Sequence, residues 1–196
     1  MRTARLVMRR WMPQDREPFA EMNADPEVMK HFPAPLDRAA SDAFADRIEA
    51  GFAEHGFGLW AVERLDTQAF IGFVGLAVPR FDAHFTPTVE VGWRLARSSW
   101  GQGFATEAGL RAVAAGFDVF GLDQIVSFTA TVNAPSIAVM RRLGMTHDPT
   151  EDFDHPSLPA DHPLRRHVLY RPRSQGRIAR YAWSAAHGSE SRSPAR

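Results

Sequence analysis

Residues 89–113, VEVGWRLARSSWGQGFATEAGLRAV, contain the passage from a strand into a helix that decides the fold. Apolar and polar side chains alternate over residues 88–96, which predicts a strand with Glu90 on the face away from the aliphatic residues. Small residues then recur at helical spacing and predict a helix that packs closely on a sheet. Between these two elements, Gly101 and Gly103 predict a glycine-rich turn that opens the helix.

This turn predicts a site for an anion. Backbone N–H groups at a helix N-terminus are unpaired, and the helix dipole adds positive charge there. An ordinary strand-to-helix turn is the alternative, but it does not require two spaced glycines. A Walker loop is excluded because Phe104 and Ala105 stand where Lys and Ser or Thr are needed. A dinucleotide fingerprint lacks its third glycine at Thr106, which leaves a nicotinamide enzyme as a weak alternative.

The remaining patterns predict one α/β domain over residues 1–173 with a mixed sheet. Upstream we expect a strand at residues 4–11, a short helix from residue 13 to about residue 23, and a second helix that starts at residues 25–26. A long helix follows at residues 37–54, then two hairpin strands at residues 58–63 and 70–78 and a loop at residues 79–87. Downstream we expect a helix at residues 104–120, a strand at residues 124–131 and a helix at residues 134–143. Two further strands are expected near residue 145 and at residues 166–171. Residues 174–196 are rich in Ser and Arg, and we expect a mobile tail.

Composition excludes several classes of function. Lys plus Arg equal Asp plus Glu at 23 each, so no overall basic field favours nucleic acid or anionic lipid as a partner. The sequence has no cysteine, which excludes a disulfide framework, a thiolate zinc site and a cysteine nucleophile. The sequence shows no apolar run of signal-peptide or membrane-spanning length, so we expect a cytoplasmic protein without membrane partners.

Two motifs together resemble a known family. Residues 89–113, followed by TATVNAPSIAVMRRLGM at residues 129–145, resemble the central motifs of the GCN5-related N-acetyltransferases (GNAT), in the RimJ/RimL-like branch of ribosomal-protein-alanine acetyltransferases. The similarity extends from TARLVMRRW at residues 3–11 to about Tyr170. Each motif alone is weakly specific, but the order and spacing of the motifs together are specific to the family. One departure is Ser98, which stands where the family motif begins with Gln or Arg.

The resemblance implies a fold and an activity. The implied fold is a central mixed, mostly antiparallel sheet, flanked by helices and splayed at the central strand to admit acetyl-CoA. The implied activity is direct transfer of an acetyl group from acetyl-CoA to a primary amine on a protein N-terminus, a peptide or a small molecule. A catalytically idle CoA-binding or sensor module is the alternative, and a homodimer is compatible with the sequence. No metal is implied.

The resemblance also implies roles for particular residues. Glu90 corresponds to a base that acts directly or through water; the alternative is an exposed carboxylate paired with an arginine. Ser136 corresponds to a general acid or hydrogen-bond donor for the leaving thiolate, and Asn133 to a cofactor contact, although Asn133 is also a good helix N-cap. The implied cofactor-binding set is completed by Leu95, Arg97, Gly101, Gln102, Gly103, Phe104, Ala105 and Thr106.

The acceptor site is the least constrained by sequence. Trp60 and Phe85 are candidates for an aromatic wall, although aromatic residues in and beside strands are more often core. Asp152 and Asp154 are candidates for attracting a cationic amine, with a solvated, proline-stiffened loop as the alternative. Residues 152–167 also hold three histidines, but their spacing is not that of a zinc site, so we expect no metal.

Overall fold

The computed structural model describes residues 1–172, so the predicted tail, 174–196, lies outside the described residues. The chain forms one sheet with the strand order β1-β2-β3-β4-β5-β8-β6, and β7 pairs with β8. The strands are β1 (Leu6–Arg9), β2 (Leu59–Arg64), β3 (Phe70–Ala77), β4 (Val89–Leu95), β5 (Ile125–Ala130), β6 (Met145–His147), β7 (Phe153–Asp154) and β8 (Arg166–Pro172). Only β4 and β5 pair in parallel within residues 1–172, which confirms the mixed, mostly antiparallel sheet.

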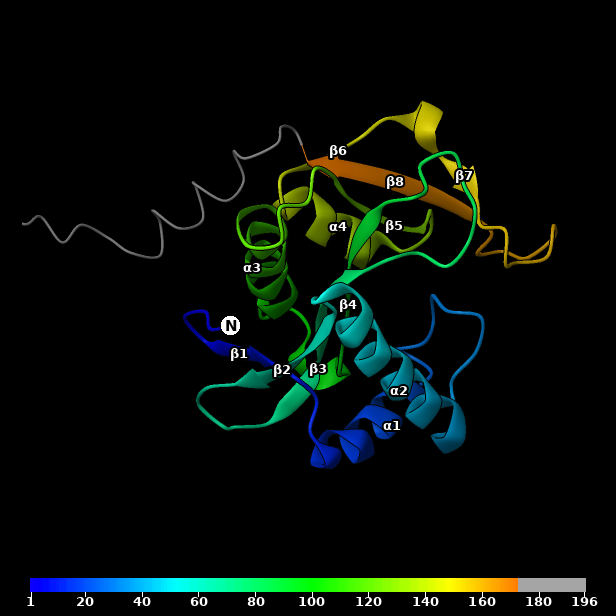
Figure 1. The fold of residues 1–196 in the computed structure, drawn as a ribbon. Helices are drawn as coiled ribbons and strands as arrows, with labels where there is room; N and C mark the ends of the chain where they lie inside the picture. The colour runs from blue at the N-terminus through cyan, green and yellow to red at the C-terminus, as the bar shows by residue number, and fades with distance from the viewer. Residues whose placement is uncertain (173–196) are drawn as a thin grey trace, which may run out of the picture.

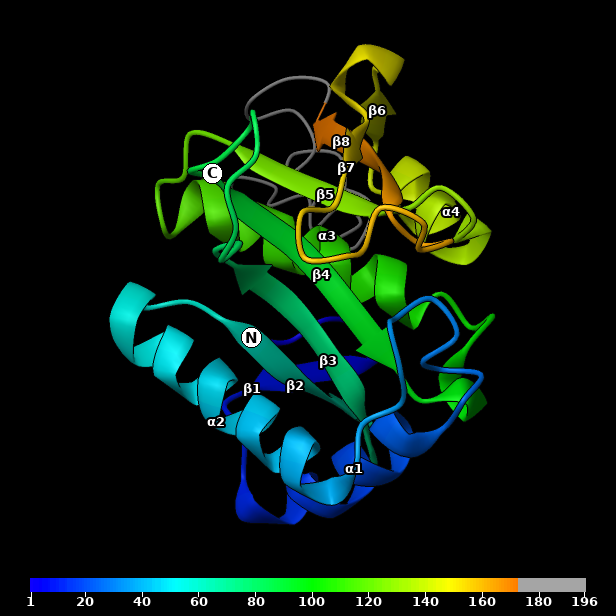
Figure 2. The ribbon, with the colours of Figure 1, turned by 90° about the vertical axis from the view of Figure 1, so that its right-hand side faces the viewer.

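Helices cover both faces of this sheet (Figures 1 and 2). One face carries α1 and α2, and the other carries α3 and α4. The helices are α1 (Arg16–Ala24), α2 (Arg38–His55), α3 (Phe104–Asp118) and α4 (Ala134–Arg142). The small residues of α3 permit the predicted close packing: a Cβ added at Gly116 would lie 2.5 Å from Cδ1 of Ile125 in β5.

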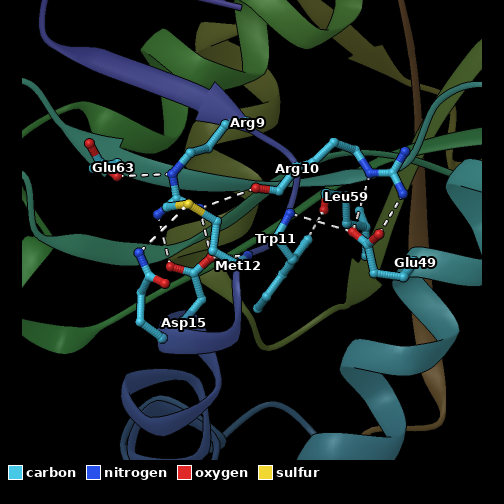
Figure 3. Close-up of polar contacts among 9 residues, drawn as sticks. Arg9, Arg10, Trp11, Met12, Asp15, Glu49, Leu59 and Glu63 are labelled. Atoms are coloured by element: carbon cyan, nitrogen blue, oxygen red, sulfur yellow. Dashed lines mark hydrogen bonds and ion pairs between the residues drawn. The ribbon is translucent and has the colours of Figure 1, made fainter.

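The segment after β1 fixes the two helices of one face to the sheet (Figure 3). Arg9 donates to both carboxylate oxygens of the buried Asp15, at 2.6 and 2.8 Å, and to Glu63 of β2 at 2.9 Å. The Trp11 indole donates to the Leu59 carbonyl at 2.7 Å. Arg10 pairs with Glu49 of α2. These contacts hold α1 and α2 in place over β2 and β3.

The central strands β4 and β5 separate soon after they meet. Their ladder contains two pairs, Val89 with Ile125 and Glu90 with Val126, although both strands continue for several residues. Beyond the ladder, the Ser127 hydroxyl donates to the Val91 carbonyl at 2.9 Å. The separation confirms the predicted splay at the central strand.

Two local predictions differ from the structure. Residues 25–37 form turns rather than a second helix beginning at Asp25-Pro26. Pro33 and Pro35 explain the difference, because proline lacks an N–H donor and restricts the residue before it. The two-residue strand β7 was not predicted, because so short a strand carries no readable alternation and depends on its pairing with β8.

Candidate active site

The turn between β4 and α3 has the geometry of an anion cradle. Gly101 and Gly103 have φ angles of +74° and +80°, a region that side chains disfavour, and both glycines are exposed. Helix α3 begins at Phe104, and its N-cap Gly103 offers no side chain to the free amides of the first turn. Those amides are therefore available to an anionic ligand, and the anion site itself stays a prediction.

Two members of the predicted cofactor-binding set, Gln102 and Phe104, have side chains that are engaged within the protein. The Gln102 side chain donates to the Ser98 carbonyl at 2.9 Å and so braces the loop. Phe104 is buried, and the guanidinium carbons of Arg5 and Arg64 lie 4.6 and 5.2 Å from its ring centroid. A phosphate would thus meet backbone amides at this position rather than these two side chains.

Sequence reasoning missed the residues before β1 that support the cradle. Glu107, in the first turn of α3, accepts hydrogen bonds from the Thr3 hydroxyl at 2.6 Å and from Arg5 Nε at 2.7 Å. Burial alone would raise the pKa of Glu107, but these hydrogen bonds hold it below its ordinary value. Arg5 also donates to the Gln102 carbonyl at 2.9 Å. No local sequence signal relates residues about a hundred positions apart.

The open edge of β4 lies beside this cradle. The Ala96 amide donates to the Ile71 carbonyl of β3, so by antiparallel alternation Trp93 and Leu95 turn their N–H and C=O groups toward β5. The Trp100 indole donates to the Leu95 carbonyl at 2.8 Å. Leu95 is therefore less open than predicted, and Trp93 presents the backbone groups that extend into the splay.

The remaining predicted cofactor residues lie at the rims of the splay. Arg97 is exposed and its guanidinium lies 3.7 Å from the Glu27 carboxylate. Asn133 caps α4: its Oδ1 accepts from the Ser136 amide at 3.3 Å, and its Nδ2 donates to Thr129 at 2.9 Å. The N-cap role of Asn133 is thereby confirmed. The Ser136 side chain is half-buried, and its hydroxyl makes no hydrogen bond within residues 1–172.

Glu90 lies on the opposite face of β4 from α3. Its carboxylate is on the side of Gly92, where a Cβ added to that glycine would be 3.6 Å from Glu90 Oε1. The side chain is partly buried, and burial raises the pKa of Glu90 to about 8. Glu90 forms no ion pair or hydrogen bond with any other described residue, so the alternative of a carboxylate paired with an arginine is wrong.

Arg94 follows on the same face, and sequence reasoning did not single it out. It is 8% exposed, donates to Asn23 Oδ1 at 2.5 Å, and lies 4.0 Å from the ring centroid of Phe32. Its Nε has no hydrogen-bond partner, and burial lowers its pKa to about 10. Asn23 in turn donates to Ser41 of α2 at 2.9 Å. This network joins the end of β4 to both helices of the Glu90 face.

The two aromatic acceptor candidates are packed rather than free. Trp60 is 7% exposed and packs against Phe52 and Phe120, with ring centroids 5.6 and 6.1 Å away. Phe85 is buried in a small cluster whose other members are Val126, Phe153 and Leu169. Both side chains are part of the core, which was the alternative to the prediction. The structure therefore does not support either residue as an aromatic wall of the acceptor site.

The predictions for Asp152 and Asp154 need correction. Asp152 lies 2.6 Å from Nε2 of His147, and Asp154 lies 3.4 and 3.3 Å from Arg165 and Arg166. Because strand side chains alternate, Asp154 points away from the face on which Phe153 joins its aromatic cluster. Both carboxylates are thus occupied within their own segment and are unsuited to attract an acceptor amine.

Residues 1–172 contain no candidate metal site and no candidate membrane-spanning helix. In this part of the chain, no three His, Cys, Asp or Glu side chains gather in a way that could hold a metal ion. Within the same residues, no helix is both long and apolar enough to cross a membrane.

Comparison with known proteins decides the family. Residues 5–146 match the family model described as Acetyltransferase (GNAT) domain. The chain belongs to the GNAT acetyltransferase family. A curated relative is the FsC-acetyl coenzyme A-N(2)-transacetylase of Aspergillus fumigatus, 32% identical over 154 residues, which cover 75% of this chain and 65% of that protein. The chain therefore spans less than two thirds of that relative's length.

Solved GNAT structures share the fold. An acetyltransferase from Agrobacterium tumefaciens is 25% identical with a TM-score of 0.71, covering 89% of this chain and 94% of its own. RimJ from Mycobacterium smegmatis, solved in complex with CoA-disulfide, is 19% identical with a TM-score of 0.69, covering 92% of this chain and 88% of its own. The likeness to RimJ at this identity concerns the fold alone.

Proposed function

We propose that the protein transfers an acetyl group from acetyl-CoA to a primary amine. Acetyltransferases of the GNAT family use acetyl-CoA. The observation that carries the proposal is the splay between β4 and β5, with an uncapped helix N-terminus on one side of it and Glu90 on the other. A donor that enters the splay from the cradle would meet an acceptor on the Glu90 face.

The residues present fit the cofactor. The amides of residues 101–105 and the dipole of α3 suit a pyrophosphate, and the two glycines keep side chains away from it. The turned-out backbone groups of Trp93 suit an extended arm that pairs as an added strand. When bound, acetyl-CoA supplies the thioester whose acetyl group is transferred. Asn133, at the opposite rim, completes the proposed cofactor-binding set.

Glu90 has the properties needed by a base in this reaction. A catalytic base works best when its pKa lies near the working pH, and burial places that of Glu90 at about 8. Glu90 accepts the proton that the attacking amine loses, directly or through water. The Ser136 hydroxyl, free of hydrogen bonds within residues 1–172, donates toward the departing sulfur. These roles remain proposals for both residues.

For the acceptor, the proposal names a class of amines rather than one compound. The motifs at residues 89–113 and 129–145 favour the RimJ/RimL-like branch, and the proposed acceptor is an amine on a protein N-terminus, a peptide or a small molecule.

The test is thiol release from acetyl-CoA with a panel of amines, combined with mass detection of the acetylated products. We expect product with at least one amine and a large loss of turnover in Glu90→Gln. An idle CoA-binding module would bind CoA yet release no thiol with any amine. That outcome would contradict the proposed activity.

A further inference from the structure

A pocket opens on the Glu90 face, next to the proposed base. It has a volume of about 190 Å³ and lies between α2 and the ends of β2 and β3. Figure 2 shows α2 along this face, with β3 and β4 beside it. Ala77 lines the pocket, and in the β3–β4 register Ala77 is the direct partner of Glu90. Directly opposed residues of an antiparallel pair share a face, so Ala77 connects the pocket to Glu90, which lies one strand away and does not itself line the pocket.

Among residues 1–172, two arginines line this pocket and no acidic side chain does. Arg47 comes from α2 and Arg80 from the loop after β3; both are exposed. Neither forms an ion pair with any residue of the described chain. By contrast, Arg38, on the same helix, pairs with both Glu17 and Asp42. Two unpaired guanidinium groups around an otherwise largely apolar pocket form a site complementary to an anion.

A third cation adds to the positive charge of this face. Arg94 is buried under Phe44, and the guanidinium carbons of Arg94 and Arg47 each lie 5.4 Å from the Phe44 ring centroid. Phe44 itself lines the pocket. No carboxylate within residues 1–172 pairs with Arg94, and a buried charge is screened less by salt than an exposed one. The Glu90 face therefore carries three guanidinium groups that form no ion pair within residues 1–172.

We propose that the acceptor carries an anionic oxygen group, a carboxylate or a phosphate, in addition to its amine, and that Arg47 and Arg80 bind that group. This inference rests on the proposed acetyl transfer and specifies its acceptor. The anion occupies the pocket between α2 and β3, and the amine lies toward Glu90. A polyamine, which has only positive charges, is repelled by the same face.

The experiment compares acceptors that differ only in the anion. Phosphoethanolamine is compared with ethanolamine, and a dipeptide is compared with the same dipeptide carrying a C-terminal amide. Spermidine represents the polyamines. With the wild-type protein we expect kcat/KM to favour the anionic member of at least one pair by tenfold or more. Arg47→Gln and Arg80→Gln should each reduce that preference several-fold, mainly by raising KM for the anionic acceptor, while kcat with the neutral partner is kept.

Arg38→Gln is the matched control, because it removes an exposed arginine of α2 whose charge is already paired. It should leave the preference unchanged, and thermal unfolding should show that all three variants remain folded. Acetylation of neutral amines or spermidine at rates equal to or above those of anionic acceptors would overturn this inference alone. Absence of product with every amine would overturn the proposed function, and this inference with it.

Discussion

Glu90 is the residue whose surroundings bear most directly on the chemistry. Its carboxyl is partly buried, has no ion-pair partner within residues 1–172, and burial raises its pKa to about 8. A carboxyl that retains its proton to this pH becomes a base only as the pH rises past that value. Both the catalytic and the stability consequences of this environment can be measured.

Glu90→Gln should lower kcat by about 10²- to 10⁴-fold, the usual contribution of a positioned acid or base. With the wild-type protein, kcat/KM should fall as the pH is lowered below about 8, because Glu90 becomes protonated. The Gln variant should lack this limb of the profile when the same acceptor is used. A wild-type rate in the Gln variant at saturating donor and amine would exclude the base role.

The same pKa predicts a dependence of stability on pH. Folded Glu90 retains its proton up to about pH 8, whereas in the unfolded chain its pKa has the ordinary value of 4.5. The folded state therefore binds more protons between these values, and the free energy of unfolding falls as pH rises through the window. Urea unfolding of wild type and Glu90→Gln should diverge from pH 5 to pH 8 in favour of Gln. Parallel curves would contradict the raised pKa.

Asn23 holds the buried guanidinium of Arg94, so its removal should be costly. Asn23→Ala leaves Arg94 without its 2.5 Å acceptor, and we expect a loss of about 1–3 kcal/mol in the free energy of unfolding. Asn23→Asp keeps an acceptor oxygen and adds a counter-charge, so it should lose less. The two variants are compared by urea unfolding. Equal losses would show that the hydrogen bond to Arg94 contributes little.

Among the elements, the turn that opens α3 has the clearest purpose. Gly101 and Gly103 both have positive φ, and a Cβ at Gly101 would meet no atom within 4 Å. Steric clash with the protein therefore does not explain glycine at position 101. The left-handed backbone conformation does, and the proposed ligand would find room there.

Gly103→Ala should weaken CoA binding more than it weakens the fold. The left-handed conformation costs a non-glycine residue about 1–2 kcal/mol, and the new methyl group stands at the anion cradle. Gly56→Ala is the matched control, since Gly56 has a φ of +75°, ends α2 and has open space around it. Both variants should lose similar thermal stability, but only Gly103→Ala should lose stabilisation by CoA. Equal stabilisation of the two by CoA would contradict the cradle.

The elements that the sequence predicted are those governed by local rules. The strand at β4, the glycine turn and α3 follow from alternation, helical spacing and positive φ within one short stretch. The pairings that sequence could not reveal are long-range. Arg5 with Glu107, and Arg94 with Asn23, join residues far apart in the chain. Asp152 and Asp154 were misread because their partners are supplied by the fold and not by composition.

At the scale of the whole molecule, the function depends on two faces of one sheet meeting at a gap. Helix α3 lies on one side of β4 and α2 on the other (Figure 2). The cradle opens α3, whereas Glu90 and the pocket of Arg47 lie on the side of α2. In the proposed function, the separation of β4 from β5 after Glu90 is where donor and acceptor meet through the sheet. Donor and acceptor can thus bind independently and still react.

The most direct measurement of this arrangement is hydrogen–deuterium exchange with and without CoA. Binding at the cradle and in the splay should protect the amides of residues 101–106 and of the end of β4 at residues 93–95, and leave the amides of β1 and β2 unchanged. NAD, added at the same concentration, should protect none of them. Protection by CoA at other segments, or none at all under saturating CoA, would contradict the account.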